Sequence, residues 1–99
     1  MNDSNKNLTM EIQSEVFEML IKHLQNKTDV QNIDLMNLAD FCRNCLSKWY
    51  VSAAKDKGLD VSYDKAREIV YGMPYNEWKD LYQKEATKEQ LEKFNARNK

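Results

Sequence analysis

Glycine, proline and histidine are scarce in this chain. Its 99 residues include two glycines, one proline and one histidine. A fold of many short β-strands needs a turn signal about every 8–12 residues, and runs that alternate apolar with polar residues are also missing. These absences exclude a many-stranded fold. Apolar residues recur instead at helical spacing, so the sequence predicts an all-α protein.

Neither sign of charge dominates, and no long apolar run occurs. Fifteen basic residues stand against sixteen acidic ones, which gives a net charge of −1. This balance provides no basic surface for nucleic acid, and no stretch approaches the ~18 apolar residues that span a bilayer. The polar amino terminus lacks a signal-peptide pattern. We therefore expect a cytoplasmic protein that binds neither nucleic acid nor membranes, with reduced cysteines.

Helix signals divide the chain into a tail and one domain. Residues 1–8 carry no pattern and predict a flexible tail. Residues 9–95 predict a single domain of four to five helices, because capping residues and glycines punctuate the apolar periodicity. Thr9 and Asp34 are the expected N-caps of the first two helices, and Gly58 is an expected stop. The expected helices cover residues 9–25, 34–57, 63–71, 75–85 and 88–95.

The first two expected helices are larger than the rest of the chain can easily cover. Apolar residues of helix 9–25 span an arc of roughly 200°, wider than the ~100° stripe of a simple surface helix. Helix 34–57 would be the central element, at roughly 35 Å long. Either helix could need a partner chain to bury its apolar surface. The sequence therefore predicts self-association, as a homodimer, or binding to another protein.

The pair Cys42-x-x-Cys45 is the one recognisable chemical spacing. Both side chains point to one side of the expected helix 34–57, and two thiolates at this spacing can supply two of the four ligands of a zinc ion. His23 is the chain's one histidine and would be a third ligand. A carboxylate, or the same pair from a second copy, would have to complete the site. Zinc bound by Cys42, Cys45 and His23 is therefore an alternative hypothesis.

Thiol redox chemistry and simple packing are the other interpretations of the pair. Redox dithiols place the first cysteine at an exposed helix N-terminus, where the dipole lowers its pKa. The expected position of Cys42, about two turns inside a helix and on its apolar face, should raise that pKa instead. Free cysteines are among the most buried residues. The simplest interpretation is that Cys42 and Cys45 fill the core and that the protein has no cofactor.

No complete catalytic motif is present. Ser52-x-x-Lys55 matches a string found in serine acyl-enzymes but lacks their supporting motifs, and no glycine-rich phosphate loop occurs. No catalytic residue is predicted, and an enzyme that uses the thiols is the remaining enzymatic hypothesis. The expected function is that of a small helical protein that binds itself or another protein.

Several longer runs resemble a known family. These runs are Thr28-Asp-Val-Gln-Asn-Ile-Asp-Leu-Met-Asn-Leu-Ala39, Phe41-Cys-Arg-Asn-Cys-Leu-Ser-Lys-Trp-Tyr50, Ala66-Arg-Glu-Ile-Val-Tyr-Gly-Met-Pro-Tyr75 and Glu77-Trp-Lys79. Together they resemble a bacterial family catalogued as domain of unknown function 1244, over roughly residues 23–91. The resemblance implies a small all-helical protein that stands alone. It brings no activity, so it assigns no catalytic or binding residue.

Overall fold

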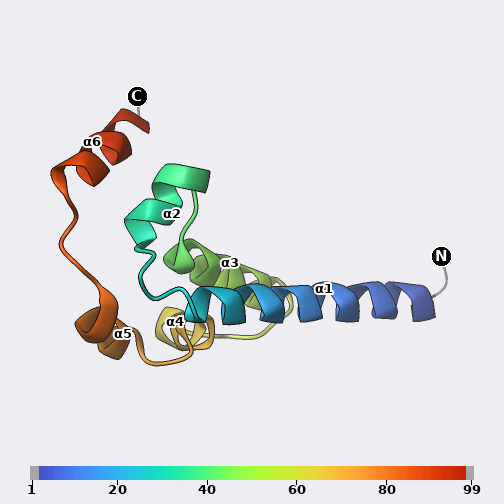
Figure 1. Ribbon diagram of the computed structural model, residues 1–99. Helices are drawn as coiled ribbons and strands as arrows, with labels where there is room; N and C mark the ends of the chain where they lie inside the picture. Colours follow the sequence, from blue (N-terminus) through green and yellow to red (C-terminus); the bar gives the residue numbers. More distant parts are fainter. Residues whose placement is uncertain (1–2, 98–99) are drawn as a thin grey trace.

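A computed structural model describes residues 3–97 of the protein, and this part of the chain forms six helices and no strand (Figure 1). The predicted all-α class is confirmed. The predicted count of four to five helices is too low, because the expected helix 34–57 is two helices. The elements are α1 (Asp3–Gln25), α2 (Asn32–Ala39), α3 (Arg43–Asp56), α4 (Tyr63–Tyr71), α5 (Tyr75–Tyr82) and α6 (Lys88–Arg97).

The first helix is longer than the sequence predicted. α1 begins at Asp3, so the part of the expected tail from Asp3 to Leu8 is helical. Residues 1–2, which belong to the same expected tail, lie outside the described residues. Thr9 is not an N-cap, because it lies inside α1 and its hydroxyl donates a hydrogen bond of 2.8 Å to the carbonyl of Asn5. That bond satisfies the hydroxyl without ending the helix.

A left-handed residue divides the expected helix 34–57. Asp40 has φ 58° and closes α2 with a 3.0 Å hydrogen bond from its amide to the carbonyl of Met36. Aspartate accepts this conformation more readily than most residues. Its carboxylate also accepts a 2.9 Å hydrogen bond from the Arg97 side chain of α6. The break is therefore supported by a contact with the far end of the chain, which local pattern does not reveal.

Gln31 sets the limits of two helices. It is the N-cap of α2, where Asp34 was expected. Asp34 lies inside the first turn, and its carboxylate accepts a 2.9 Å hydrogen bond from the backbone amide of Gln31. The Gln31 side chain donates to the Tyr82 carbonyl and accepts from the Lys84 amide, both at 2.9 Å. These two bonds hold the backbone after α5 in an extended form, so α5 ends at Tyr82 and not at residue 85.

The later helices follow their local signals more closely. α4 has the predicted bounds, because the Ser62 hydroxyl accepts from the Lys65 amide and Gly72, at φ 76°, ends the helix. α6 begins as predicted, with Thr87 and Gln90 forming a reciprocal capping box. It ends at Arg97 and is two residues longer than the predicted helix 88–95.

The core is built around the contact between α3 and α4 and includes side chains from α1, α2 and α5. α4 also packs against α1 and α5, whereas α2 packs mainly against α6 (Figure 1). The Trp78 ring meets Tyr71 edge-on, with 5.0 Å between the ring centroids. No helix in residues 3–97 is long and apolar enough to cross a membrane. The buried apolar side chains are Ile21, Leu24, Leu35, Cys42, Leu46, Ala66, Val70, Tyr71 and Trp78.

Candidate functional site

The cysteine pair lies at the start of α3. Cys42 is the extended N-cap residue and Cys45 lies in the first turn. Both thiols are free, and their sulfurs are 3.8 Å apart. The predicted position of Cys42 two turns inside a helix is therefore wrong, because the chain breaks at Asp40. The pair sits instead where the positive end of a helix dipole favours negative charge.

A third sulfur joins the pair from the other side of the break. The Sδ atom of Met36, in α2, is 3.9 Å from the Sγ atom of Cys45. Cys42 is buried, whereas Met36 and Cys45 are half-buried and reach the surface. We call Met36, Cys42 and Cys45 the sulfur cluster.

Burial raises the pKa of the Cys42 thiol above its ordinary value. The amides of Asn44 and Cys45 lie near the sulfur and oppose this rise, although neither makes a regular capping hydrogen bond to it. The direction of the pKa shift is the one expected from the sequence, but its cause is burial at the start of α3 and not a position two turns inside a helix. Because the thiolate is the nucleophile of cysteine chemistry, a raised pKa argues against Cys42 as an activated nucleophile at neutral pH.

His23 does not join the sulfur cluster. It is exposed near the end of α1. Among the residues that the structure describes, no three His, Cys, Asp or Glu side chains lie together so as to hold a metal ion. Zinc sites in proteins use four ligands, or three and a water. A single copy of the chain therefore does not assemble the zinc site of Cys42, Cys45 and His23 that the sequence suggested.

Arg43, between the two cysteines, is almost fully buried. Its guanidinium donates hydrogen bonds of 2.9 Å to the carbonyls of Lys27 and Val30 and of 3.1 Å to the Asn32 side chain. It also lies over the Trp78 ring, 4.9 Å from the centroid. Burial lowers the pKa of Arg43 from its ordinary value. The residue fixes the connector between α1 and α2 against α3, which is a structural role.

Asn32 links Arg43 to a buried tyrosine. Its side-chain nitrogen donates to the Tyr71 hydroxyl at 3.0 Å. That hydroxyl in turn donates to the side-chain oxygen of Asn44 at 2.7 Å. Burial raises the pKa of Tyr71 well above its ordinary value, with the Asn32 hydrogen bond opposing the rise. This chain of bonds keeps the hydroxyl neutral and satisfied inside the protein.

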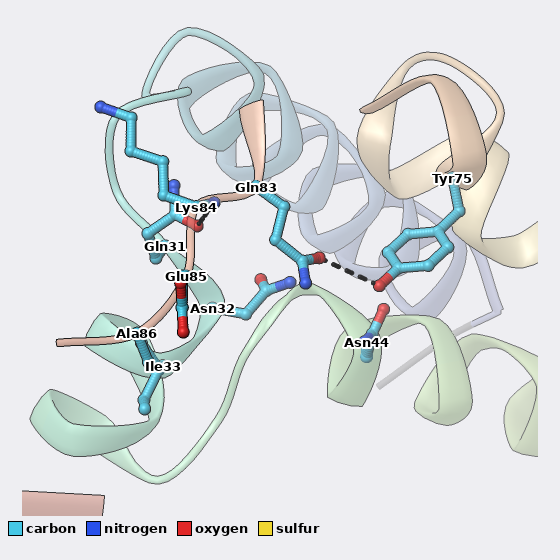
Figure 2. A pocket seen from close by; sticks show the side chains of 9 residues that line it. All are labelled: Gln31, Asn32, Ile33, Asn44, Tyr75, Gln83, Lys84, Glu85 and Ala86. Atoms are coloured by element: carbon cyan, nitrogen blue, oxygen red, sulfur yellow. Dashed lines mark hydrogen bonds between the residues drawn. The ribbon is translucent and has the colours of Figure 1, made fainter. Parts of the chain in front are cut away.

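A polar pocket of about 320 Å³ opens beside this chain of hydrogen bonds. Figure 2 shows the side chains of Asn32, Asn44, Tyr75 and Gln83 gathered on one side of it, while Lys84 extends away. The Tyr75 hydroxyl donates a 3.2 Å hydrogen bond to Gln83. Ligand pockets are usually lined mainly by apolar groups. The polar groups of this lining are side-chain amides, the phenol of Tyr75 and the charged side chains of Lys84 and Glu85.

The most exposed apolar surface lies on α1. Five large apolar side chains and His23 occupy one side of the helix, at helical spacing. The apolar residues are 37–64% exposed. The opposite side carries Phe17, Ile21 and Leu24 into the core. We call the exposed side the outer face of α1; its members are Leu8, Ile12, Val16, Met19, Leu20 and His23.

A second apolar surface lies between α1 and α3. A groove of about 330 Å³ is bounded by Phe17 of α1 and by Leu46, Trp49, Tyr50 and Ala53 of α3. Trp49 is 58% exposed and stacks on Phe41. The apolar face of α3 therefore opens to the surface at this groove.

Two residues of this region were missed by sequence reasoning. Met36 showed no signal, because a continuous helix would place it on the side opposite Cys45, nine residues later. Arg43 showed no signal either, because an arginine is seldom buried without an acidic partner. The polar connector before α2, whose carbonyls need donors, was the available clue to its place.

Comparison with known proteins identifies one family. A family model described as a protein of unknown function, DUF1244, matches residues 30–96. The match includes the sulfur cluster, Arg43 and the polar pocket, and it begins after α1. No curated protein matches the chain.

Proposed function

The chain belongs to the DUF1244 family of proteins of unknown function, and we propose that it is a helical module that self-associates through the outer face of α1. The observation that carries this proposal is the exposure of that face. Ile12, Val16 and Met19 are 60%, 58% and 64% exposed, although large apolar side chains gain about 1.5–3 kcal/mol each on full burial.

The spacing on this face suits a second helix. Ile12, Val16, Met19 and His23 follow the alternating steps of four and three residues that form the seam of a coiled coil. α1 contains 23 residues, so the seam has room for several layers. One copy alone leaves these positions open to solvent.

The charges beside the seam favour a second copy in the antiparallel direction. Glu15 and Lys22 flank the seam on the same side and are exposed. In an antiparallel pair, with Val16 packed beside Met19 of the second copy, Glu15 lies near Lys22 of that copy and the reverse contact forms as well. Charges beside a seam set partner choice and orientation. Glu11 and Glu18 lie on the same flank and disfavour an anionic membrane as the occupant.

Sedimentation velocity across the low and middle micromolar range tests the proposal. The wild-type protein should form a dimer, and Val16→Glu should be a folded monomer, because the glutamate would be buried in the seam. Leu81→Glu is the matched control, since Leu81 is 66% exposed on α5, and it should still dimerise. A monomeric wild type, or equal association of wild type and Val16→Glu, would refute the proposal.

A charge exchange tests the orientation. Glu15→Lys and Lys22→Glu should each weaken the dimer, and the double variant should restore it, because the pair recovers opposite charges. Flotation with vesicles of mixed neutral and anionic lipid tests the competing occupant. Vesicle binding by the wild type that Val16→Glu abolishes, without any dimer, would assign the face to membranes.

A further inference from the structure

We propose that Met36, Cys42 and Cys45 bind one Cu(I) ion per chain through their three sulfur atoms. The proposal concerns a different part of the molecule from the outer face of α1 and does not depend on self-association. It starts from two sulfur–sulfur contacts, 3.8 Å between Cys42 and Cys45 and 3.9 Å between Cys45 and Met36.

These distances suit a metal ion between the sulfurs. With metal–sulfur bonds of about 2.3 Å, the sulfurs of a planar three-coordinate site are about 4.0 Å apart. The two separations that involve Cys45 lie close to that value. In the proposed site, rotation of the Met36 and Cys42 side chains brings these two sulfurs to the same separation around the ion.

The donor set selects the ion. Thiolates and thioethers are soft ligands and prefer Cu(I), whereas zinc readily takes nitrogen and oxygen ligands as well and completes a four-ligand shell. In residues 3–97, no His, Asp or Glu joins the two cysteines to make a metal-binding group. The thioether of Met36 is the third donor within reach, and it favours a soft monovalent cation over Zn²⁺.

The surroundings provide access on one side and exclude water on the other. Cys42 is 7% exposed and belongs to the core, whereas Met36 and Cys45 are half-buried and provide the entry side. Leu35, Phe41 and Leu46 belong to the same apolar cluster. Two thiolates and one Cu(I) carry a net charge of −1, which the N-terminus of α3 stabilises through its dipole.

The charge balance predicts how binding depends on pH. The two thiols lose two protons when they bind Cu(I), the thioether loses none, and no electron is transferred. At pH values where both thiols are protonated, the affinity should therefore rise by about 100-fold per pH unit. This slope distinguishes a dithiolate site from binding by neutral sulfur alone.

Competition with a Cu(I)-specific chelator tests the proposal. The full-length protein, reduced and kept free of oxygen, is titrated against the coloured Cu(I)–bicinchoninate complex, and X-ray absorption then counts the sulfur ligands. The expected result is one Cu(I) per chain with three sulfurs. Met36→Leu, which is close in volume and keeps both thiols, should retain the fold, show two sulfurs and bind more weakly by at least about tenfold.

Matched variants make the result decisive. Met73→Leu is the control, because Met73 packs against the same core but outside the sulfur cluster, and its affinity should equal that of the wild type. Cys45→Ser should lose stoichiometric binding. The proposal is overturned if the wild type removes no Cu(I) from the chelator, if Met36→Leu binds as tightly as the wild type, or if Zn²⁺ binds more tightly than Cu(I).

Discussion

Replacing the buried Arg43 by methionine should lower the free energy of unfolding by more than replacing an exposed cation such as Lys48. The guanidinium is 1% exposed and supplies the three hydrogen bonds to Lys27, Val30 and Asn32. A further contact, to the Leu24 carbonyl, is longer at 3.4 Å. Methionine fills a similar volume but donates nothing from its side chain. The Val30 carbonyl then loses its donor, whereas the Lys27 carbonyl keeps the Val30 amide and the Asn32 side chain keeps the Arg43 backbone amide.

The magnitude follows from the hydrogen bonds that the guanidinium supplies. A hydrogen bond from a charged donor contributes about 1.5–3 kcal/mol, and three such bonds are lost. The carbonyls of Lys27 and Val30 are only part-buried in these bonds, so water recovers some of the loss. We expect the free energy of unfolding to fall by about 3–5 kcal/mol, a large share of the ~5–15 kcal/mol of a domain this size.

Urea unfolding measures this loss. With an m-value of about 1–2 kcal/mol/M, the midpoint should fall by roughly 2–3 M. Lys48→Met is the control, because Lys48 is an exposed cation of the same helix, and it should shift stability by less than about 0.5 kcal/mol. Arg43→Lys should fall between the two, because one ammonium cannot reach all three acceptors. A loss below about 1 kcal/mol for Arg43→Met would show that the buried cation is not held as described.

Two further changes test the backbone and the buried phenol. In urea unfolding, Gly72→Ala should lower the free energy of unfolding by about 2–4 kcal/mol and Gly58→Ala by about 1–2 kcal/mol. Both glycines have positive φ, but only at Gly72 would a Cβ meet a side chain, that of Gln25, at 2.8 Å. Equal losses for the two variants would contradict this packing. Tyr71 has a raised pKa when folded, so its contribution to stability is complete below the ordinary tyrosine pKa of 10.0 and is lost as pH rises above it. Urea unfolding at increasing pH should show this loss of stability in the wild type. Tyr71→Phe, although less stable at neutral pH, should lose less stability over the same pH range. If the free energies of unfolding of the two proteins fall in parallel with pH, the role given to Tyr71 is wrong.

The sequence predicted the helix ends that are set by contacts between neighbouring residues. α4 has its predicted bounds because Ser62 and Gly72 act on the backbone beside them. Asp40 gave no such signal, since an aspartate is compatible with both a helix interior and a left-handed turn. Its conformation is supported by Arg97, which lies 57 positions later in the chain. Contacts of this range cannot be read from periodicity.

The candidate sites show the same limit. The spacing of Cys42 and Cys45 was visible in the sequence, but their position at a helix start and the approach of Met36 depend on the break at Asp40. The exposed side of α1 was predicted as a second apolar side of the helix. Which side would face the core was not predictable, because apolar side chains lie on both.

The start of α1 has a consequence for how the protein folds. Every described side chain from Asn5 to Val16 is exposed, so this segment gains little from packing within one chain. Isolated helices shorter than ~12–15 residues are marginal in water. The segment's helical order should therefore grow as copies associate, and circular dichroism at 222 nm should strengthen with protein concentration. Assembly and the completion of secondary structure would then be one equilibrium, with the population of ordered α1 set by the amount of protein present.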